Sequence, residues 1–305
     1  MTQTAPRPDI AAADRPSRKR RDLATPRRLT RGQAIAQGIV LTLGAIAFLF
    51  PFYYMVIGSL QTSPDTTVAG AFPHPGNLTL QNYANIDSRI DLVQGLVNSG
   101  IFTGGVLLGT VVFGVLAGYS LAILQWRGRG ATFALALLVQ TIPFQLLMIP
   151  LYVLIARNYG LADNYLGMIL PFAINSAAVL IFRQYFLQLP RELFDAARID
   201  GAGEFALLWR IALPLVRPAL VTALLLTFIG PWNEFLWPFL ITKDASLQPL
   251  AVSLANYIST VSSSTANPYG AILAGAVVLA APVVVLFIVF QRYFTSSDLG
   301  SSVKG

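Results

Sequence analysis

The chain has no cysteine, a single histidine and only three lysines among its 305 residues. The absence of cysteine excludes disulfides, thiolate catalysis, iron–sulfur clusters and thiolate-bound zinc. A serine–histidine–aspartate triad would have to use His74, which lies between two prolines in a polar loop. No lysine follows a glycine, so the chain lacks the phosphate-binding loop that many ATPases use. We therefore expect no catalytic residue, no metal ligand and no cofactor in this chain, which is not an enzyme.

Charge is scarce as well. Charged residues make up 11% of the chain, whereas an ordinary soluble domain has about 25%. Hydrophobic residues make up 55%, which leaves too little polar surface for a soluble fold. The composition therefore predicts an integral membrane protein.

The net charge of +7 is concentrated near the N-terminus, because nine of the 21 Lys and Arg lie in residues 1–31. This segment lacks apolar periodicity, which predicts a disordered basic tail. We expect it in the cytoplasm, attracted to anionic membrane lipid. A nucleic-acid-binding arm is the alternative, but the charges of the remaining chain are nearly balanced and we expect no nucleic-acid partner.

Six apolar runs follow, and each is long enough to cross a membrane as a helix of about 20 residues. We expect an all-α integral membrane protein with a six-helix transmembrane domain at 32–294 and a cytoplasmic tail at 295–305. The segments 65–91 and 243–268 are expected to be outer loops. The predicted spans lie within 32–64, 92–126, 130–156, 165–186, 215–240 and 269–290.

The distribution of basic residues predicts the orientation. If the N-terminus is cytoplasmic, the inner segments hold 18 of the 21 Lys and Arg, and the outer ones hold Arg89, Arg157 and Lys243. The positive-inside rule strongly favours this topology. Both termini and the polar segment 190–214 are then cytoplasmic.

Two features of the spans have more than one interpretation. The run 92–126 carries three Gly-x-x-x-Gly pairs, a spacing that lets helix backbones approach closely in lipid. The pairs pack either within the chain or against a second, similar subunit. Glu234, toward one end of its span, is either a solvated carboxylate in an aromatic belt or part of a polar pathway.

The segment 190–214 has the pattern of two short amphipathic helices joined by a glycine turn. Pro190 suits a helix start, and Gly201 stops the first helix. The second helix would cover Glu204–Ala212, and Pro214 would end it. Its predicted apolar face consists of Phe205, Leu208, Trp209 and Ala212.

Three other roles for this loop fit less well than docking to a protein. Three Arg stand against four acidic residues between Pro190 and Pro214, which is the wrong balance for a helix lying on anionic lipid. The same acidic excess and the two flanking spans argue against a DNA-binding helix-turn-helix. A plain connector needs no apolar stripe. Docking of a helix in a groove of a cytoplasmic partner accounts best for the pattern.

The loop resembles the EAA loop of the membrane subunits of bacterial ABC importers. The resemblance lies in Asp195-Ala196-Ala197, then Gly201, Ile211 and Leu213-Pro214, at the spacing of that motif. Asp195 stands where the family usually has glutamate, so the charge is kept and the reach is one methylene shorter.

A more extended resemblance, which covers about Phe50 to Gly305 of this chain, is to the MalG-type carbohydrate importer permeases. Ser297 and Ser301 depart from that pattern, because the family tends to have glycine there. The matching stretches include Asn98-Ser99, Trp232-Asn233-Glu234-Phe235 and Gln291-Arg292-Tyr293-Phe294.

The resemblance implies an ABC type I importer permease fold in the bacterial inner membrane. Such importers combine two similar permeases, two ATPase subunits that bind ATP and magnesium, and an extracytoplasmic solute-binding protein that delivers a sugar. The loop would insert into an ATPase subunit, whose closure drives alternating access. The implied coupling residues are Glu192, Asp195, Ala196, Ala197, Asp200, Gly201, Ile211, Leu213 and Pro214.

The resemblance also suggests two further sites. Val303-Lys304-Gly305 is similar to a tail that reaches into the ATPase interface. Gln145, Asn175 and Asn233 are candidates for the translocation pathway. The alternative function is a membrane adaptor or energy-independent channel whose loop only recruits a cytoplasmic protein. Which sugar is carried stays open, as does a related polar solute such as a glycerol phosphodiester.

Overall fold

The computed structural model describes residues 30–65, 67–261 and 267–299. Most of the predicted basic tail and the Val303-Lys304-Gly305 contact therefore lie outside the described residues. Contacts divide the chain into two units, 1–51 and 52–305, which are described separately. The described residues are helical apart from short turns and one isolated bridge between Gln61 and Leu78.

Helix α1 (Arg31–Ser59) contains Pro51 and is long and apolar enough to cross a membrane. Its start is fixed by a reciprocal capping box. The Gln33 N–H donates to Thr30 Oγ1 at 3.4 Å, and the Thr30 N–H donates to Gln33 Oε1 at 3.0 Å.

The described residues contain three single helices and three bent helix pairs that are long and apolar enough to cross a membrane, which makes up to six spans. The single helices are α1, α3 (Leu92–Ala122) and α14 (Tyr269–Leu299), in which residues up to Gln291 qualify as a span. This confirms the predicted all-α membrane class. The helix α14 runs beyond the end predicted for its span at residue 290.

The third predicted span is not one straight helix. Helix α4 (Arg129–Val139) and the helix formed by α5 (Phe144–Tyr152) and the π-helical η3 (Val153–Asn158) meet at 96°. Pro143 lies at the corner with an extended ψ of 129°. Its ring also disfavours a helical conformation of the residue before it, which suits the end of the preceding helix.

The fourth and fifth spans are also interrupted. Helices α6 (Tyr165–Ala173) and α7 (Ser176–Leu187) meet at 45°, where the Asn175 side chain caps α7 by accepting from the N–H of Ala177. Helix α11 (Arg217–Asn233) is separated from α12 (Leu236–Ile241) by a break at Glu234 and Phe235.

The two predicted outer loops contain helices, which corrects that prediction. The first holds η1 (Val68–Ala71), η2 (Pro75–Asn77) and α2 (Gln81–Ile90), and the second holds η5 (Ala245–Leu247) and α13 (Leu250–Val261). Helix α2 is polar overall, whereas α13 is mostly apolar. Both bury apolar residues against each other, α3 and α14, which stabilises them as helices.

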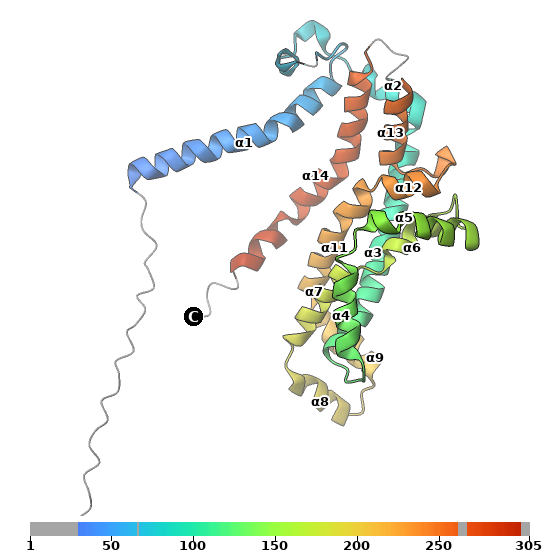
Figure 1. Ribbon diagram of the computed structural model, residues 1–305. Helices are drawn as coiled ribbons and strands as arrows, with labels where there is room; N and C mark the ends of the chain where they lie inside the picture. Colours follow the sequence, from blue (N-terminus) through green and yellow to red (C-terminus); the bar gives the residue numbers. More distant parts are fainter. Residues whose placement is uncertain (1–29, 66, 262–266, 300–305) are drawn as a thin grey trace, which may run out of the picture. The chain divides into compact units, whose positions relative to one another are not determined.

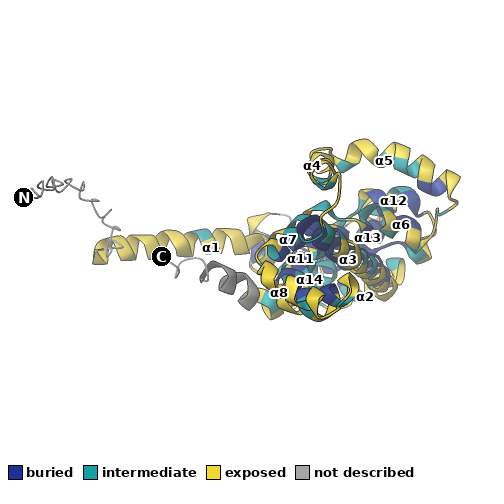
Figure 2. Ribbon diagram, turned by 90° about the horizontal axis from the view of Figure 1, so that it is seen from below, coloured by how far each residue is buried: buried dark blue, intermediate teal, exposed yellow. Residues whose placement is uncertain are grey.

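Helix α3 is the centre of the unit 52–305 and packs against α6, α7, α11 and α13 (Figure 2). Two of its glycine pairs make this close packing possible within the chain. A Cβ on Gly109 would lie 2.8 Å from Ala173, and a Cβ on Gly118 would lie 2.6 Å from Phe182. Gly100 and Gly104 have nothing within 4 Å of such a Cβ.

Within the same unit, α8 (Arg191–Ile199) and α9 (Glu204–Ala206) lie at one end, and α2 and α13 lie at the other (Figure 1). The polar loop and the outer helices therefore occupy opposite ends of the α3, α7 and α11 packing unit, as the predicted topology requires.

Candidate functional site

The first helix of the polar loop lies where it was predicted, to within one residue at each end. Pro190 precedes α8, which begins at Arg191 with Glu192 in its first turn and ends with Arg198 in its last, so both charges suit the helix dipole. Gly201 has a φ of +86°, a conformation that glycine adopts at no steric cost. The glycine turn between the two helices is therefore confirmed.

The second helix is longer than predicted. It comprises α9, the π-helical η4 (Leu207–Ala212) and α10 (Leu213–Leu215). Pro214 does not end the helix, because it lies inside α10 as the second residue after the π-helical segment. The break comes at Val216, with φ −100° and ψ 21°.

The predicted apolar face of this helix is partly wrong. Leu208 and Ala212 are buried as expected, but Phe205 and Trp209 are 70% and 48% exposed, and Leu207 takes their place in the core. In a π turn about one more residue fits into each turn, so the buried face follows a longer period than the α-helical stripe.

The loop is held to the spans by an aromatic core. Phe194 of α8 is 1% exposed and packs beside Tyr119 of α3, with ring centroids 6.3 Å apart. Tyr119 in turn makes an edge-to-face contact with Phe186 of α7, at 5.6 Å and 87°. Phe194, in the middle of α8, therefore joins this helix to the inner ends of α3 and α7.

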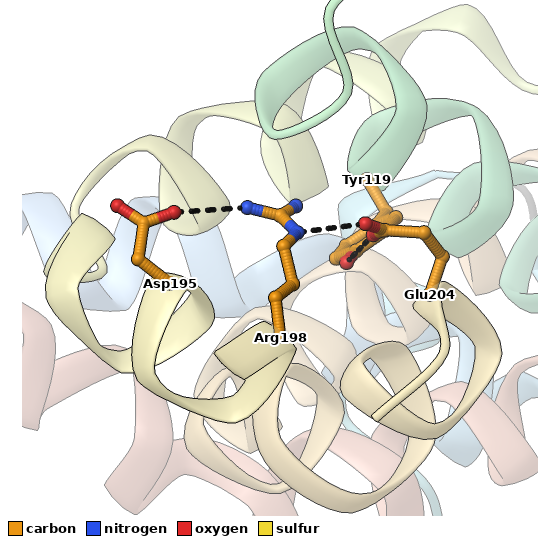
Figure 3. A network of polar contacts seen from close by, with 4 residues as sticks. All are labelled: Tyr119, Asp195, Arg198 and Glu204. Carbon is orange, nitrogen blue, oxygen red and sulfur yellow. Dashed lines mark hydrogen bonds and ion pairs between the residues drawn. The ribbon is translucent and has the colours of Figure 1, made fainter. Parts of the chain in front are cut away.

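A polar network reinforces this attachment (Figure 3). The Tyr119 hydroxyl donates to Glu204 Oε2 at 2.8 Å, and Arg198 Nε donates to Glu204 Oε1 at 2.8 Å. Arg198 Nη1 also lies 3.1 Å from Asp195 Oδ1. The hydrogen bond from Arg198 is the main cause that holds the pKa of Glu204 below its usual value.

The sequence prediction missed Tyr119, Arg198 and Glu204 as a group. The ion pair between Asp195 and Arg198 could have been predicted from the sequence, since its i, i+3 spacing is typical of ion pairs on a helix surface. Tyr119, 85 positions from Glu204, carries no local signal for the contact.

The predicted coupling residues divide between two environments. Glu192, Asp195 and Ala196 are exposed on the outward face of α8, together with Ile199, which is 86% exposed. Asp200, Gly201 and Pro214 are exposed as well. Ala197, Ile211 and Leu213 are half-buried and pack against the core around Tyr119 and Phe194.

At the break of the fourth span lies a cavity of about 340 Å³, whose wall is mostly apolar and contains a few polar side chains. Asn175 lines it, and its Nδ2 lies 3.5 Å from Thr227 Oγ1 of α11. Gln140 and Glu234 also line the cavity, and the sequence prediction did not assign Gln140 to it. The other two candidates are elsewhere, because Gln145 is exposed and Asn233 donates to the backbone carbonyl of Ile229.

At its outer end, α3 is fixed by Asn98 and Ser99. Asn98 Nδ2 donates to the carbonyls of Ser246 and Gln248, both at 2.9 Å, and Ser99 Oγ accepts from the N–H of Leu250 at 2.9 Å. These bonds hold the loop before α13 beside a groove of about 1100 Å³ that is lined mainly by polar side chains. Among the described residues, no group of three or more His, Asp and Glu could hold a metal ion.

Comparison with known proteins places these features in a family. Residues 110–297 match the model of the binding-protein-dependent transport system inner membrane component. The chain is 33% identical over 277 residues to the arabinooligosaccharides transport system permease protein AraQ of Bacillus subtilis, covering 89% of this chain and 96% of that one. It is 32% identical over 270 residues to the sn-glycerol-3-phosphate transport system permease protein UgpE of Yersinia pestis, covering 87% and 95%.

A solved structure supports the same conclusion. A chain of a bacterial ABC transporter involved in the import of the acidic polysaccharide alginate superposes with a TM-score of 0.75 at 25% identity, over 87% of this chain and 99% of that one. The predicted resemblance to ABC importer permeases is thereby confirmed, as is the prediction of a non-catalytic, multi-pass inner-membrane subunit. The chain belongs to the family of binding-protein-dependent transport system inner membrane components.

Proposed function

We propose that this chain is one permease of an ATP-driven sugar importer and that α8 is its contact with an ATPase subunit. The main observation in support is the outward face of α8. Glu192, Asp195, Ala196 and Ile199 are spaced i, i+3, i+4 and i+7, so they share one face, and all four are exposed. An acidic face with an 86% exposed isoleucine is suited to a groove on a protein partner.

The contacts behind α8 provide a route for the movement. Closure of the ATPase subunits on ATP and magnesium would displace α8. The Phe194 packing and the bonds through Arg198, Glu204 and Tyr119 then transfer the displacement to α3. The 31 residues of α3 form a continuous helix, which would carry the shift toward the outer end at Asn98. The binding energy of ATP would thus bias inward-facing against outward-facing states.

The cavity at Asn175 is the proposed part of the translocation pathway. Its polar side chains include Gln140, Asn175, Thr227 and Glu234, and it has no Lys or Arg among its lining residues. Amide, hydroxyl and carboxylate groups suit the hydroxyls of a neutral sugar, whereas a phosphate would need cationic partners. We therefore favour a neutral sugar over a phosphorylated solute.

The partners follow from this function. We propose one second, homologous permease, two ATPase subunits that carry the ATP and magnesium, and one extracytoplasmic solute-binding protein. Membrane lipid surrounds the spans. Val303-Lys304-Gly305 remains a proposed contact with the ATPase subunits. The family and its named transport-system relatives favour this assembly over an adaptor or energy-independent channel.

Charge reversal on α8 tests the coupling contact. Asp195→Lys is expected to abolish co-purification of the ATPase subunit and ATP-dependent sugar uptake into proteoliposomes. Arg157→Asp is the matched control, because Arg157 is exposed on the predicted outer side and has no ion pair among the described residues. Full uptake and full co-purification in Asp195→Lys would refute the proposal.

A further inference from the structure

The second helix of the loop, Glu204–Leu215, lies across the direction of the span that follows it. It makes an angle of 77° with α11. Membrane-spanning helices are tilted on average by only about 20° from the bilayer normal. A helix nearly perpendicular to such a span runs close to the plane of the membrane, at the depth where the span begins.

This helix has apolar residues on two sides. One side, with Leu207, Leu208 and Ala212, is already buried against the core. The other side exposes Phe205 and Trp209, whose rings pair at a centroid distance of 5.9 Å. The exposed pair therefore needs an apolar environment that the described residues do not supply.

The two helices of the loop carry side chains of different charge. Glu192, Asp195 and Asp200 lie on α8 or at its end, and Glu204 is bound to Arg198 and Tyr119. From residue 205 to residue 217 the only charged side chains are Arg210 and Arg217, which are exposed and have no ion pair among the described residues. The acidic excess that disfavours lipid contact for the loop as a whole thus belongs to α8 and not to the second helix.

We infer that the helix Glu204–Leu215 lies in the headgroup region of the inner leaflet. Phe205 and Trp209 enter the boundary between headgroups and acyl chains, which is where amphipathic aromatic rings concentrate. Arg210 and Arg217 face the lipid phosphates. The chain passes directly from this helix through the bend at Val216 into the membrane-spanning α11, so the exposed face borders the membrane surface of the protein. This position favours lipid over a second protein as the occupant of the face.

The consequence is a loop with two surfaces of different chemistry. The acidic face of α8 is left for a protein, and the aromatic and basic face of the second helix rests on lipid. An interfacial anchor at this position fixes the depth of the loop in the membrane. A displacement of α8 then moves the spans instead of rotating the whole loop.

The absence of native cysteine allows a direct test with single-cysteine variants. Phe205→Cys, Trp209→Cys and Ile199→Cys would each carry a nitroxide label. The complete transporter would be placed in nanodiscs of phosphatidylcholine with a minor fraction of phosphatidylglycerol, and the permease pair would be measured with and without the ATPase subunits. Spin relaxation by oxygen, which partitions into lipid, is compared with relaxation by a water-soluble nickel chelate.

We expect labels at 205 and 209 to collide with oxygen several-fold more than with the nickel chelate, whether or not the ATPase subunits are present. A label at 199 is expected to be open to nickel and protected only when the ATPase is bound. Ready access of nickel to 205 and 209, or protection there that depends on the ATPase, would overturn the lipid contact. Protection at 199 tests the coupling role of α8 separately, so the two proposals fail in different ways.

Arg210→Gln combined with Arg217→Gln tests the charge component in the same labelled proteins. The contrast between oxygen and nickel at 209 is expected to increase with the phosphatidylglycerol fraction in the parent and to lose that dependence in the double variant. An unchanged dependence would show that these arginines do not face lipid phosphates.

Discussion

At the scale of single residues, Glu204 is where the bonds between the loop and the spans meet. Its two carboxylate oxygens accept from different elements, Tyr119 of α3 and Arg198 of α8. Each bond alone contributes modestly, because a typical hydrogen bond adds about 1 kcal/mol to stability. Their importance under the proposed function is geometric, since they join the helix that contacts the ATPase to the helix that crosses the membrane.

Tyr119→Phe removes one of these bonds and retains the ring packing with Phe186 and Phe194. We expect co-purification of the ATPase subunit to be unchanged and the number of sugars transported per ATP hydrolysed to fall. Tyr159→Phe is the control, because Tyr159 is 62% exposed and has no side-chain hydrogen bond among the described residues. Equal transport ratios in both variants would contradict the proposed route.

The lowered pKa of Glu204 predicts a pH dependence of stability. A carboxyl group whose pKa is depressed on folding stabilises the fold above its unfolded pKa of about 4.5, and this contribution is lost as the pH falls through the folded value. The melting temperature of the parent should therefore exceed that of Glu204→Gln at neutral pH, and the difference should shrink below about pH 4. The effect is small, at most about 1 kcal/mol, because the side chain is 45% exposed. A difference that grows on acidification would contradict the assignment.

At the scale of elements, the packing of α3 against α7 depends on a missing side chain. A Cβ on Gly118 would lie 2.6 Å from Phe182 Cβ and 3.0 Å from the backbone nitrogen of Arg183. Close approach here brings Tyr119, the next residue, into reach of the loop.

Gly118→Ala is therefore expected to lower the free energy of unfolding by about 1–3 kcal/mol, which is typical of overpacking. Gly100→Ala is the matched control in the same helix, since nothing lies within 4 Å of the added carbon. There the gain in helix propensity should leave stability unchanged or slightly higher. Denaturant titration of both variants in the same detergent measures the difference, and equal losses would contradict close packing at Gly118.

At the scale of the whole molecule, sugar binding and ATPase coupling are proposed at separate places. Thr227→Val changes the polarity of the cavity wall at nearly constant volume, because the hydroxyl beside Asn175 is replaced by a methyl group. We expect a several-fold higher KM for sugar uptake, with ATPase stimulation by the solute-binding protein retained. Thr222→Val in the same helix does not line the cavity and should leave both unchanged. Uptake with the parental KM in Thr227→Val would exclude the cavity from the pathway.

The sequence by itself determined the membrane class, the six apolar runs and the limits of α8 with its turn at Gly201. These features depend on composition, charge and the conformational freedom of one glycine, all of which can be read from the local sequence without knowledge of long-range contacts. The spacing of the motif residues from Asp195 to Pro214 was also sufficient to identify the family.

Only the tertiary structure decided which surfaces are available. It breaks the predicted spans at Pro143, Asn175 and Glu234. It also exposes Phe205 and Trp209 and joins Tyr119 to Glu204. A π turn shifts the face of a helix without a clear local signal, and a contact across 85 residues depends on how α3, α7 and the loop pack together. Sequence periodicity describes the faces of ideal helices, whereas packing selects which of those faces meet.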